Sequence, residues 1–219
     1  MNLSDSGIYI RPYQKNDRAC LMKIAYDTAF MGDSAEVFFE DECVLSDFLT
    51  LYFTDYESES IFVADKDGRA VGYIIGAQDA KKLNKVFVLK ILPLLILKVL
   101  LRGTFLKKKA ARFIFNSIIS SLKKEFVAPD LSKEFPAVLH INIDKDYRHS
   151  NIGRELINVF LKYLANKGVK GVHLSTMSEN GKSFFEKMWF SLVHQAKRTY
   201  FRNILGKEII CYSMVKPFV

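Results

Sequence analysis

Hydrophobic and polar positions change their spacing several times along the chain, and each change marks an expected element. Ile8 and Ile10 alternate with polar neighbours before Pro12, a pattern that predicts a short strand ended by a residue without a backbone donor. Asp17 can cap a helix, because apolar residues then recur at the three- and four-residue steps of one helix face. A second helix is expected over about 42–52 on the same grounds.

The remaining pattern alternates between strand-like and helix-like runs. Lys66-Asp67-Gly68 is a turn-forming sequence between two β-rich runs, so it predicts an antiparallel hairpin. Gly168 provides the stop for a long helix that follows a short polar turn. Strands are expected over about 60–65, 69–78, 137–143, 169–176, 190–197 and 208–216, and further helices over 152–167 and 180–188. This order predicts an α/β fold with a mixed sheet, in a single domain over 1–219.

Residues 83–127 interrupt the pattern and are called the insert below. The run from Val86 to Leu101 is apolar except for Lys90 and Lys98, and it contains Pro93, so it is too short and too charged to span a membrane. We expect a pair of amphipathic helices that pack their Leu and Ile faces on the domain while lysines point outward. An interfacial membrane helix, a homodimer contact and a lid over an apolar substrate remain as alternatives.

Charge is unevenly distributed. The stretch from Asp27 to Asp65 contains eleven carboxylates and no Lys or Arg, whereas Ala80 to Val127 contains twelve bases and only Glu125 as an acid. The net charge of +8 therefore arises in one segment. This indicates a local anionic partner of that segment rather than a nucleic-acid-binding protein, because the segment is aliphatic and has no known readout motif.

Composition narrows the class of protein. The 219 residues are 49% hydrophobic and 26% charged, which is enough apolar content for a folded core and excludes a disordered chain. The cysteines Cys20, Cys43 and Cys211 lie far apart, without a C-x-x-C pair or a spacing to histidine that would bind zinc. The first residues do not resemble a signal peptide, so a reducing, cytoplasmic compartment is expected.

The turn between the strand 137–143 and the helix from 152 has the chemistry of an anion site. Backbone N–H groups at a helix start are unpaired, and the helix dipole adds partial positive charge. Gly153 allows a ligand to approach the backbone, Asn151 tolerates a left-handed conformation, and Arg148 and Arg154 add charge. A pyrophosphate would fit, although the same residues could simply shape an ordinary solvated helix start.

The residues 146–154, Asp-Tyr-Arg-His-Ser-Asn-Ile-Gly-Arg, resemble the acetyl-coenzyme A signature of the GNAT N-acetyltransferase superfamily, R/Q-x-x-G-x-G/A. Leu139-His140-Ile141-Asn142-Ile143, Gly171-Val172-His173-Leu174 and the 184–190 segment Phe-Phe-Glu-Lys-Met-Trp-Phe resemble the flanking family segments, in the correct order. The resemblance covers nearly the whole chain except the insert. It extends to the subgroup related to the acetyltransferase-like domain of O-GlcNAcases.

The resemblance implies a V-shaped splay between the strands 137–143 and 172–176, into which the pantetheine arm of acetyl-CoA inserts. No metal is required. The implied cofactor contacts are the backbone near Ile141 and Ile143, the loop residues Arg148, His149, Ser150, Asn151, Ile152, Gly153 and Arg154, and Ser178 and Phe185 on the far side. The implied activity is transfer of acetyl to a small or peptidyl amine, and the acidic stretch suggests a cationic acceptor.

The chain departs from the family at the catalytic positions. The tyrosine that often protonates the leaving thiolate falls on Phe185, and positions that hold a general base in some members fall on Ala137 and Leu139. Deprotonation through water to Glu40 or Asp41 is one hypothesis, and a non-catalytic acyl-CoA-binding module is the rival function. His140 points away from the face of Ala137 and is expected to be structural.

Two further positions carry expectations. Trp189 replaces a glycine common in the family and is expected to pack against the protein. His173 lies in a strand pattern, where a half-buried histidine with a hydrogen-bond partner is expected. A peripheral membrane contact or a homodimer contact through the insert is compatible with either function.

Overall fold

The computed structural model describes residues 7–148 and 151–218. Their core is a seven-stranded mixed sheet in the order β1-β2-β3-β4-β5-β7-β6, in which only the β4–β5 pair is parallel. The strands are β1 (Ile8–Pro12), β2 (Phe62–Lys66), β3 (Arg69–Ala77), β4 (Ala137–Ile143), β5 (Gly171–Thr176), β6 (Ser191–Arg198) and β7 (Ile209–Pro217). The predicted α/β class with a mixed sheet is confirmed, and every strand expected from the sequence is present.

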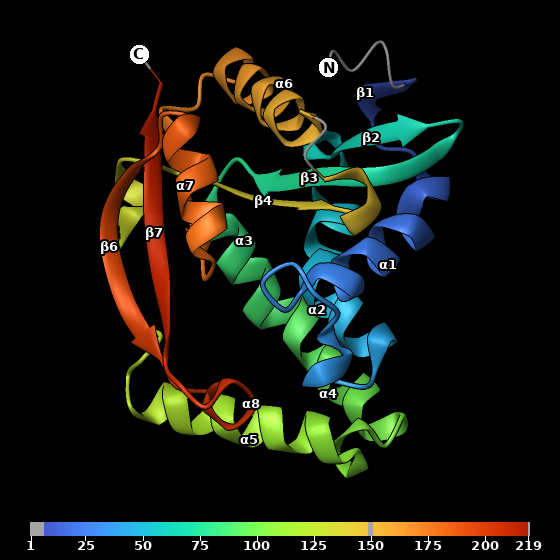
Figure 1. Cartoon of the computed structure of the whole chain (residues 1–219), viewed down its shortest axis with the longest axis vertical. Coiled ribbons are helices and arrows are strands. Elements are labelled where there is room, and N and C mark those ends of the chain that lie inside the picture. The colour runs from blue at the N-terminus through green and yellow to red at the C-terminus, as the bar shows by residue number, and fades with distance from the viewer. Residues whose placement is uncertain (1–6, 149–150, 219) are drawn as a thin grey trace.

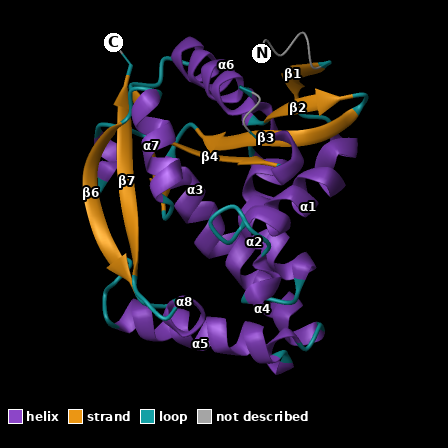
Figure 2. Ribbon diagram, viewed as in Figure 1, coloured by secondary structure: helices purple, strands orange, loops and turns teal. Residues whose placement is uncertain are grey.

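Helices cover both faces of the sheet (Figures 1 and 2). The helices are α1 (Arg18–Thr28), α2 (Glu42–Tyr56), α3 (Ala80–Val86), α4 (Leu92–Leu101), α5 (Lys108–Leu122), α6 (Ile152–Asn166), α7 (Glu179–Lys187) and the short α8 (Arg202–Leu205). Helices α6 and α7 pack on one face through Leu156, Phe160 and Phe185. Helices α1 and α2 cover the other face, where Leu21 and Ala25 of α1 contact strand residues of β2 and β3.

Close approach between α6 and the sheet requires glycine at one position. A Cβ on Gly76 of β3 would lie 2.2 Å from Cζ of Phe160 and 2.3 Å from the carbonyl oxygen of Val138. Neither atom belongs to a side chain end that can swing away, because the ring is fully buried and the oxygen is backbone. The glycine therefore sets how closely α6 and β4 pack on β3.

The insert forms a helical arm made of α3, α4 and α5. A π-helical turn, Phe87–Ile91, joins α3 to α4, and Pro93 stands in the first turn of α4. Proline lacks the N–H of a regular helical bond and its ring crowds the carbonyl four residues earlier, which explains the wider turn at this point. None of the helices among the described residues is long and apolar enough to cross a membrane.

The arm differs from the amphipathic pair that the sequence predicts. Helix α4 buries Leu95 against α2, but most of its other leucines and isoleucines are exposed, and Lys98 turns inward to Asp47. The prediction that apolar faces pack inward and lysines point outward is therefore wrong for α4. Asp47 draws Lys98 inward. Leucines and isoleucines lie around most of the surface of α4, so packing against α2 covers only part of them.

Helix α5 closes the far end of the molecule. In Figure 1 it runs between the lower end of the β6–β7 hairpin, which carries α8, and the region of α2 and α4. An aromatic cluster joins these parts. The ring of Phe113 of α5 stacks on Phe201 with 5.6 Å between ring centroids, and it lies tilted against Phe38 with 4.7 Å between centroids. The arm is thus attached both to the loop before α2 and to the hairpin.

Candidate cofactor and acceptor site

Strands β4 and β5 separate soon after they begin. They pair only through Ala137–Val172 and Val138–His173, while β4 continues to Ile143 along β3 and β5 continues to Thr176 along β7. Beyond the second pair, the facing edges of the two strands have no strand partner among the described residues. Exposed strand edges present N–H and C=O groups that can pair with an extended ligand. The V-shaped splay that the resemblance implies is confirmed.

The N-terminus of α6 lies directly beyond the end of β4. Asn151 precedes the helix in the left-handed conformation with φ 59°, as the sequence predicts, and within the described residues no side chain caps the helix. The first turn therefore directs backbone N–H groups and the positive end of the helix dipole outward. Ile152 and Gly153 are buried, so the chain contributes its backbone here rather than its side chains. His149 and Ser150 lie outside the described residues.

The two arginines of this loop have different roles. Arg148 turns back: its Nε donates to the carbonyl of Ile143 at 3.2 Å and its Nη2 donates to the carbonyl of Gly32. It therefore fixes the loop between α1 and α2 against the end of β4. Arg154 is exposed on the first turn of α6, and in the described part of the chain it has no ion pair or hydrogen bond. Of the two, Arg154 is the side chain placed to meet an anion.

Helix α7 borders the same region. A Cβ on Gly153 would lie 3.0 Å from Cζ of Phe184, so the glycine allows α6 and α7 to approach closely. Ser178 caps α7 by accepting a hydrogen bond from the N–H of Gly181 at 3.3 Å. Phe185, which the sequence places at the cofactor, is buried and packs against Phe190 at 5.4 Å between ring centroids. The phenylalanine that meets the start of α6 is Phe184, which sequence reasoning did not single out.

His140 stands in the splay, two residues beyond the last β4–β5 pair. It is the only ionisable side chain of β4, and it lies on the face opposite Leu139, toward α1 and α2. Its side chain is exposed and has no hydrogen-bond partner among the described residues. Desolvation by the surrounding protein nevertheless lowers the pKa of His140. The expectation of a purely structural role is not supported, because an exposed, unpartnered imidazole holds nothing in place.

The other sequence expectations have mixed outcomes. The half-buried His173 has its Nδ1 2.6 Å from the carbonyl oxygen of Phe135, as expected. Trp189 does not pack: 83% of it is exposed, and its φ of 65° is a conformation that glycine adopts easily. Trp189 therefore has a backbone conformation suited to glycine, the residue common at this position in the family.

The carboxylates proposed as distant bases are already engaged. Asp41 is buried at the start of α2, where it meets Arg102 Nε at 3.1 Å, Thr104 Oγ1 at 2.7 Å and Lys107 Nζ at 3.3 Å. Burial alone would raise the pKa of Asp41, but these three contacts outweigh it and lower the pKa to about 2. A carboxylate this acidic and enclosed is a poor proton acceptor, so the hypothesis of a water relay to Asp41 does not fit.

Glu40 is occupied in a similar way. Its two carboxylate oxygens accept hydrogen bonds from the backbone N–H groups of Lys109 and Ala110, at 3.0 and 2.9 Å. Burial would raise the pKa of Glu40, but the bonds from these two amides outweigh it and lower the pKa. Glu40 thus caps the start of α5. Together with Asp41, it shows that part of the charge of the basic arm is paired within the same chain.

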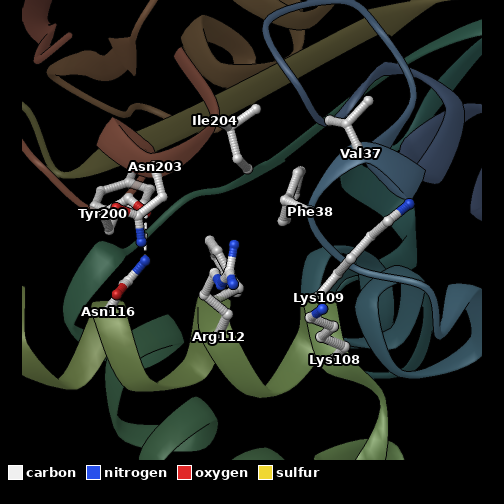
Figure 3. Close-up of a pocket in the computed structure, with 10 residues that line it drawn as sticks. Val37, Phe38, Lys108, Lys109, Arg112, Asn116, Tyr200, Asn203 and Ile204 are labelled. Atoms are coloured by element: carbon white, nitrogen blue, oxygen red, sulfur yellow. Dashed lines mark hydrogen bonds between the residues drawn. The ribbon is translucent and has the colours of Figure 1, made fainter. Parts of the chain in front are cut away.

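A cavity of about 260 Å³ lies where α5 meets α8 and the turn before Phe38. Figure 3 shows Arg112 reaching between Phe38 and Ile204, with Lys108 and Lys109 on one side and Asn116 on the other. The hollow is therefore lined by both apolar side chains and bases. It lies at the far end of the molecule from α6, so it is separate from the splay.

Comparisons with known proteins agree with this geometry at the level of the fold. No family model matches the chain, and no curated protein matches it. Among solved structures, a protein called SsHAT is 24% identical, with a TM-score of 0.72 over 96% of this chain and 98% of that one.

Two further neighbours carry an activity in their names. A Drosophila melanogaster polyamine N-acetyltransferase that forms N-acetylagmatine is 14% identical, with a TM-score of 0.62 over 96% of this chain and all of its own. The putative acetyltransferase yncA from Salmonella typhimurium, solved with its cofactor acetyl-CoA, is 11% identical, with a TM-score of 0.56 over 96% of this chain and 94% of its own. With its seven-stranded mixed sheet, its β4–β5 splay and these neighbours, the chain has the fold of the GNAT acetyltransferases.

Proposed function

We propose that this protein transfers the acetyl group of acetyl-CoA to the nitrogen of an amine. The observation that carries the proposal is the start of α6, which no side chain of the described residues caps, directly beyond two diverging strand edges. One feature suits a diphosphate and the other suits the amide-bearing arm of the cofactor. The acetyl-CoA complex of a structural neighbour supports the same cofactor.

The residues present fit acetyl-CoA. Backbone groups of Ile141 and Ile143 lie on the edge of β4 that faces the splay, where they can pair with the arm. We assign the phosphates to the amides of Ile152 and Gly153, in the first turn of α6, and to the exposed side chain of Arg154. When bound, acetyl-CoA supplies a thioester whose carbonyl carbon accepts a nucleophile.

His140 is the proposed general base of this reaction. The lowered pKa of His140 keeps the imidazole neutral at physiological pH, so that it can accept a proton from the amine. The amine nitrogen forms a bond to the carbonyl carbon, the carbon–sulfur bond breaks, and its electron pair leaves on the thiolate. The thiolate takes its proton from water, because Phe185 has no proton to give.

The acceptor is proposed to be an amine whose attacking nitrogen has lost its extra proton. The rest of the acceptor is either neutral or cationic. A neighbour named for an agmatine product supports a cationic amine. The acidic stretch supports it less than its sequence suggests, because Asp41, Asp47 and Glu40 are already bound to the arm. A panel of agmatine, a neutral primary amine and a peptide with a free N-terminus covers these classes.

Release of free thiol from acetyl-CoA, measured with this panel, tests the proposal. Saturable release that depends on an amine supports it, whereas tight cofactor binding without turnover on any amine would support the rival binding module. His140→Gln should lower kcat by about 100-fold or more while leaving acetyl-CoA affinity unchanged. The rise of the rate with pH through the pKa of His140 should disappear as well. His194→Gln on the edge strand β6 is the matched control and should leave both unchanged.

A further inference from the structure

The insert presents an unusual amount of apolar surface to solvent. Helix α4 buries only Leu95 fully, and Leu101 at its end is 78% exposed. The turn that follows adds Leu106, which is 76% exposed. The remaining large exposed apolar residues of α4 and this turn are Leu92, Leu94, Ile96, Leu97, Leu100 and Phe105. Folded soluble monomers rarely leave this many neighbouring apolar side chains uncovered unless the surface binds something.

Helix α5 carries a second exposed apolar face, which has a regular pattern. Phe115, Ile118 and Leu122 are exposed and recur at steps of three and four residues, so they form one outward stripe. Leu122 is 79% exposed. The buried side of the helix carries Ala110 and Phe113, which contact the aromatic cluster. The outward stripe is therefore not needed to hold α5 in place.

Bases that form no ion pair with the described residues flank this stripe. Lys108 and Arg112 lie on α5 beside the stripe and line the hollow shown in Figure 3. Lys123 and Lys124 are exposed directly after the helix. Glu125 is the only acid of the insert, and its carboxylate accepts hydrogen bonds from the N–H and hydroxyl of Thr199. None of these four bases has an ion pair among the described residues.

The charge distribution selects one occupant for this surface. A second copy of the chain, joined face to face, would oppose basic residues with basic residues. The carboxylates nearest to the insert cannot bridge to another copy, because Asp41, Asp47 and Glu40 are bound within this one. The outward faces of α4 and α5 are helix surfaces, which a fluid phase can cover without a matching shape.

We infer that the insert docks on an anionic lipid surface, with the outward faces of α4 and α5 in the interface and the flanking bases on the headgroups. The described helices are too short to cross a bilayer, so the contact is interfacial. Apolar area supplies affinity, and each base near the surface adds an electrostatic contribution that salt screens. This inference does not depend on acetyl transfer.

Flotation of the full chain with vesicles tests the inference. Vesicles of phosphatidylcholine with phosphatidylserine should bind the protein at low salt, and vesicles of phosphatidylcholine alone should bind it much more weakly. Lys123→Gln should weaken binding about fivefold, the effect of one base near the surface. Phe115→Ser with Leu122→Ser should weaken it at least about tenfold without lowering the thermal midpoint, because both side chains are exposed. Trp189→Ser removes an exposed apolar side chain outside the insert and should leave binding unchanged.

Tryptophan fluorescence gives the orientation. Trp189 is the only tryptophan, and it precedes β6, which begins at the end of the sheet far from α5 (Figure 1). In a Trp189→Phe background, Phe115→Trp should shift to the blue and be quenched by brominated lipid, whereas wild-type Trp189 should not be quenched. Failure to bind anionic vesicles overturns the inference, as does binding that Phe115→Ser with Leu122→Ser leaves intact. A concentration-dependent dimer that these two substitutions abolish would assign the surface to a second copy instead.

Discussion

Asp41→Asn tests whether one buried carboxylate attaches the insert to the rest of the protein. Asp41 has no exposed side-chain surface and meets three groups of the insert, Arg102, Thr104 and Lys107. Its pKa is about 2 instead of the ordinary 3.8, a difference that corresponds to about 2.5 kcal/mol of stability at neutral pH. Asparagine removes the charge that the two bases meet, so most of this free energy should be lost.

The expected effect is measurable in two ways. For a chain of this length, a loss of about 2.5 kcal/mol lowers the thermal midpoint by roughly 5–10 °C. Urea unfolding at pH 7 should give the free energy directly. The bonds from Asp41 also hold the turn between α4 and α5, so limited proteolysis should cut near residues 102–109 faster in the variant.

The pH dependence separates this explanation from a general defect. The folded-state pKa of Asp41 is depressed, so its contribution is complete above about pH 4 to 5 and disappears as the pH falls through about 2. The stability difference between wild type and variant should therefore be constant from pH 5 to 7 and shrink below pH 4.

Glu42→Gln is the matched control for this experiment, because Glu42 is the next residue, carries the same charge and is exposed. It should change stability by less than about 0.5 kcal/mol. The reasoning fails if Asp41→Asn is as stable as the control, or if its deficit persists unchanged at pH 2.

Two other substitutions test the packing and the charges of the sheet. Gly76→Ala should lower the free energy of unfolding in urea by about 3 kcal/mol or prevent folding, because its Cβ would overlap Phe160 and a backbone oxygen. Gly72→Ala, whose added Cβ would have its nearest contact at 3.3 Å, should lower it by less than about 1 kcal/mol. Equal losses would contradict this reasoning. Arg11→Met leaves Asp17 and Asp65 buried without their base and should cost about 3–5 kcal/mol at pH 7. Burial would raise the pKa of Asp17, but its hydrogen bonds to Arg11 and Gln14 lower it. The loss of stability in Arg11→Met should therefore decline as the pH falls below about 4. A loss that grows there would refute the role of Arg11 as the base that stabilises these carboxylates.

Local patterns in the sequence predicted the fold well. Alternation at 137–143 and the three- and four-residue steps of 152–167 depend on nearest neighbours, so both elements are present at nearly the expected bounds. The left-handed Asn151 and the splay followed from local chemistry and from the resemblance to a known fold. The additional turn of helix α8, between β6 and β7, was not expected, because its four residues are too few to show the three- and four-residue spacing of a helix.

Long-range contacts could not be predicted in the same way. Arg148 was expected at the phosphates, but it donates to Gly32, 116 residues away in the chain. Arg102 and Lys107 meet Asp41 across 61 and 66 residues, and these contacts turn two bases of the insert toward the domain. The spacing of residues along the sequence does not reveal such pairs, because the two charges come into contact only after folding has brought their segments together.

His140 is the instructive case within the site. Alternation placed its side chain on the correct face of β4, opposite Leu139. Sequence could not reveal that this face is left open at His140, because that depends on where α1, α2 and the insert end. The exposed position of His140 is the reason that we propose it as a proton acceptor rather than as a structural support.

Calorimetric titration with acetyl-CoA is the most direct test of the central claim that the α6 amides bind a diphosphate beside the splay. The account predicts saturable binding of one acetyl-CoA per chain, and much weaker binding of acetyl-pantetheine, which lacks the diphosphate. Arg154→Glu should weaken the binding of acetyl-CoA, whereas Lys162→Glu, exposed further along the same helix, should not. Absence of saturable heat with acetyl-CoA, or equal affinity for the two thioesters, would contradict the account.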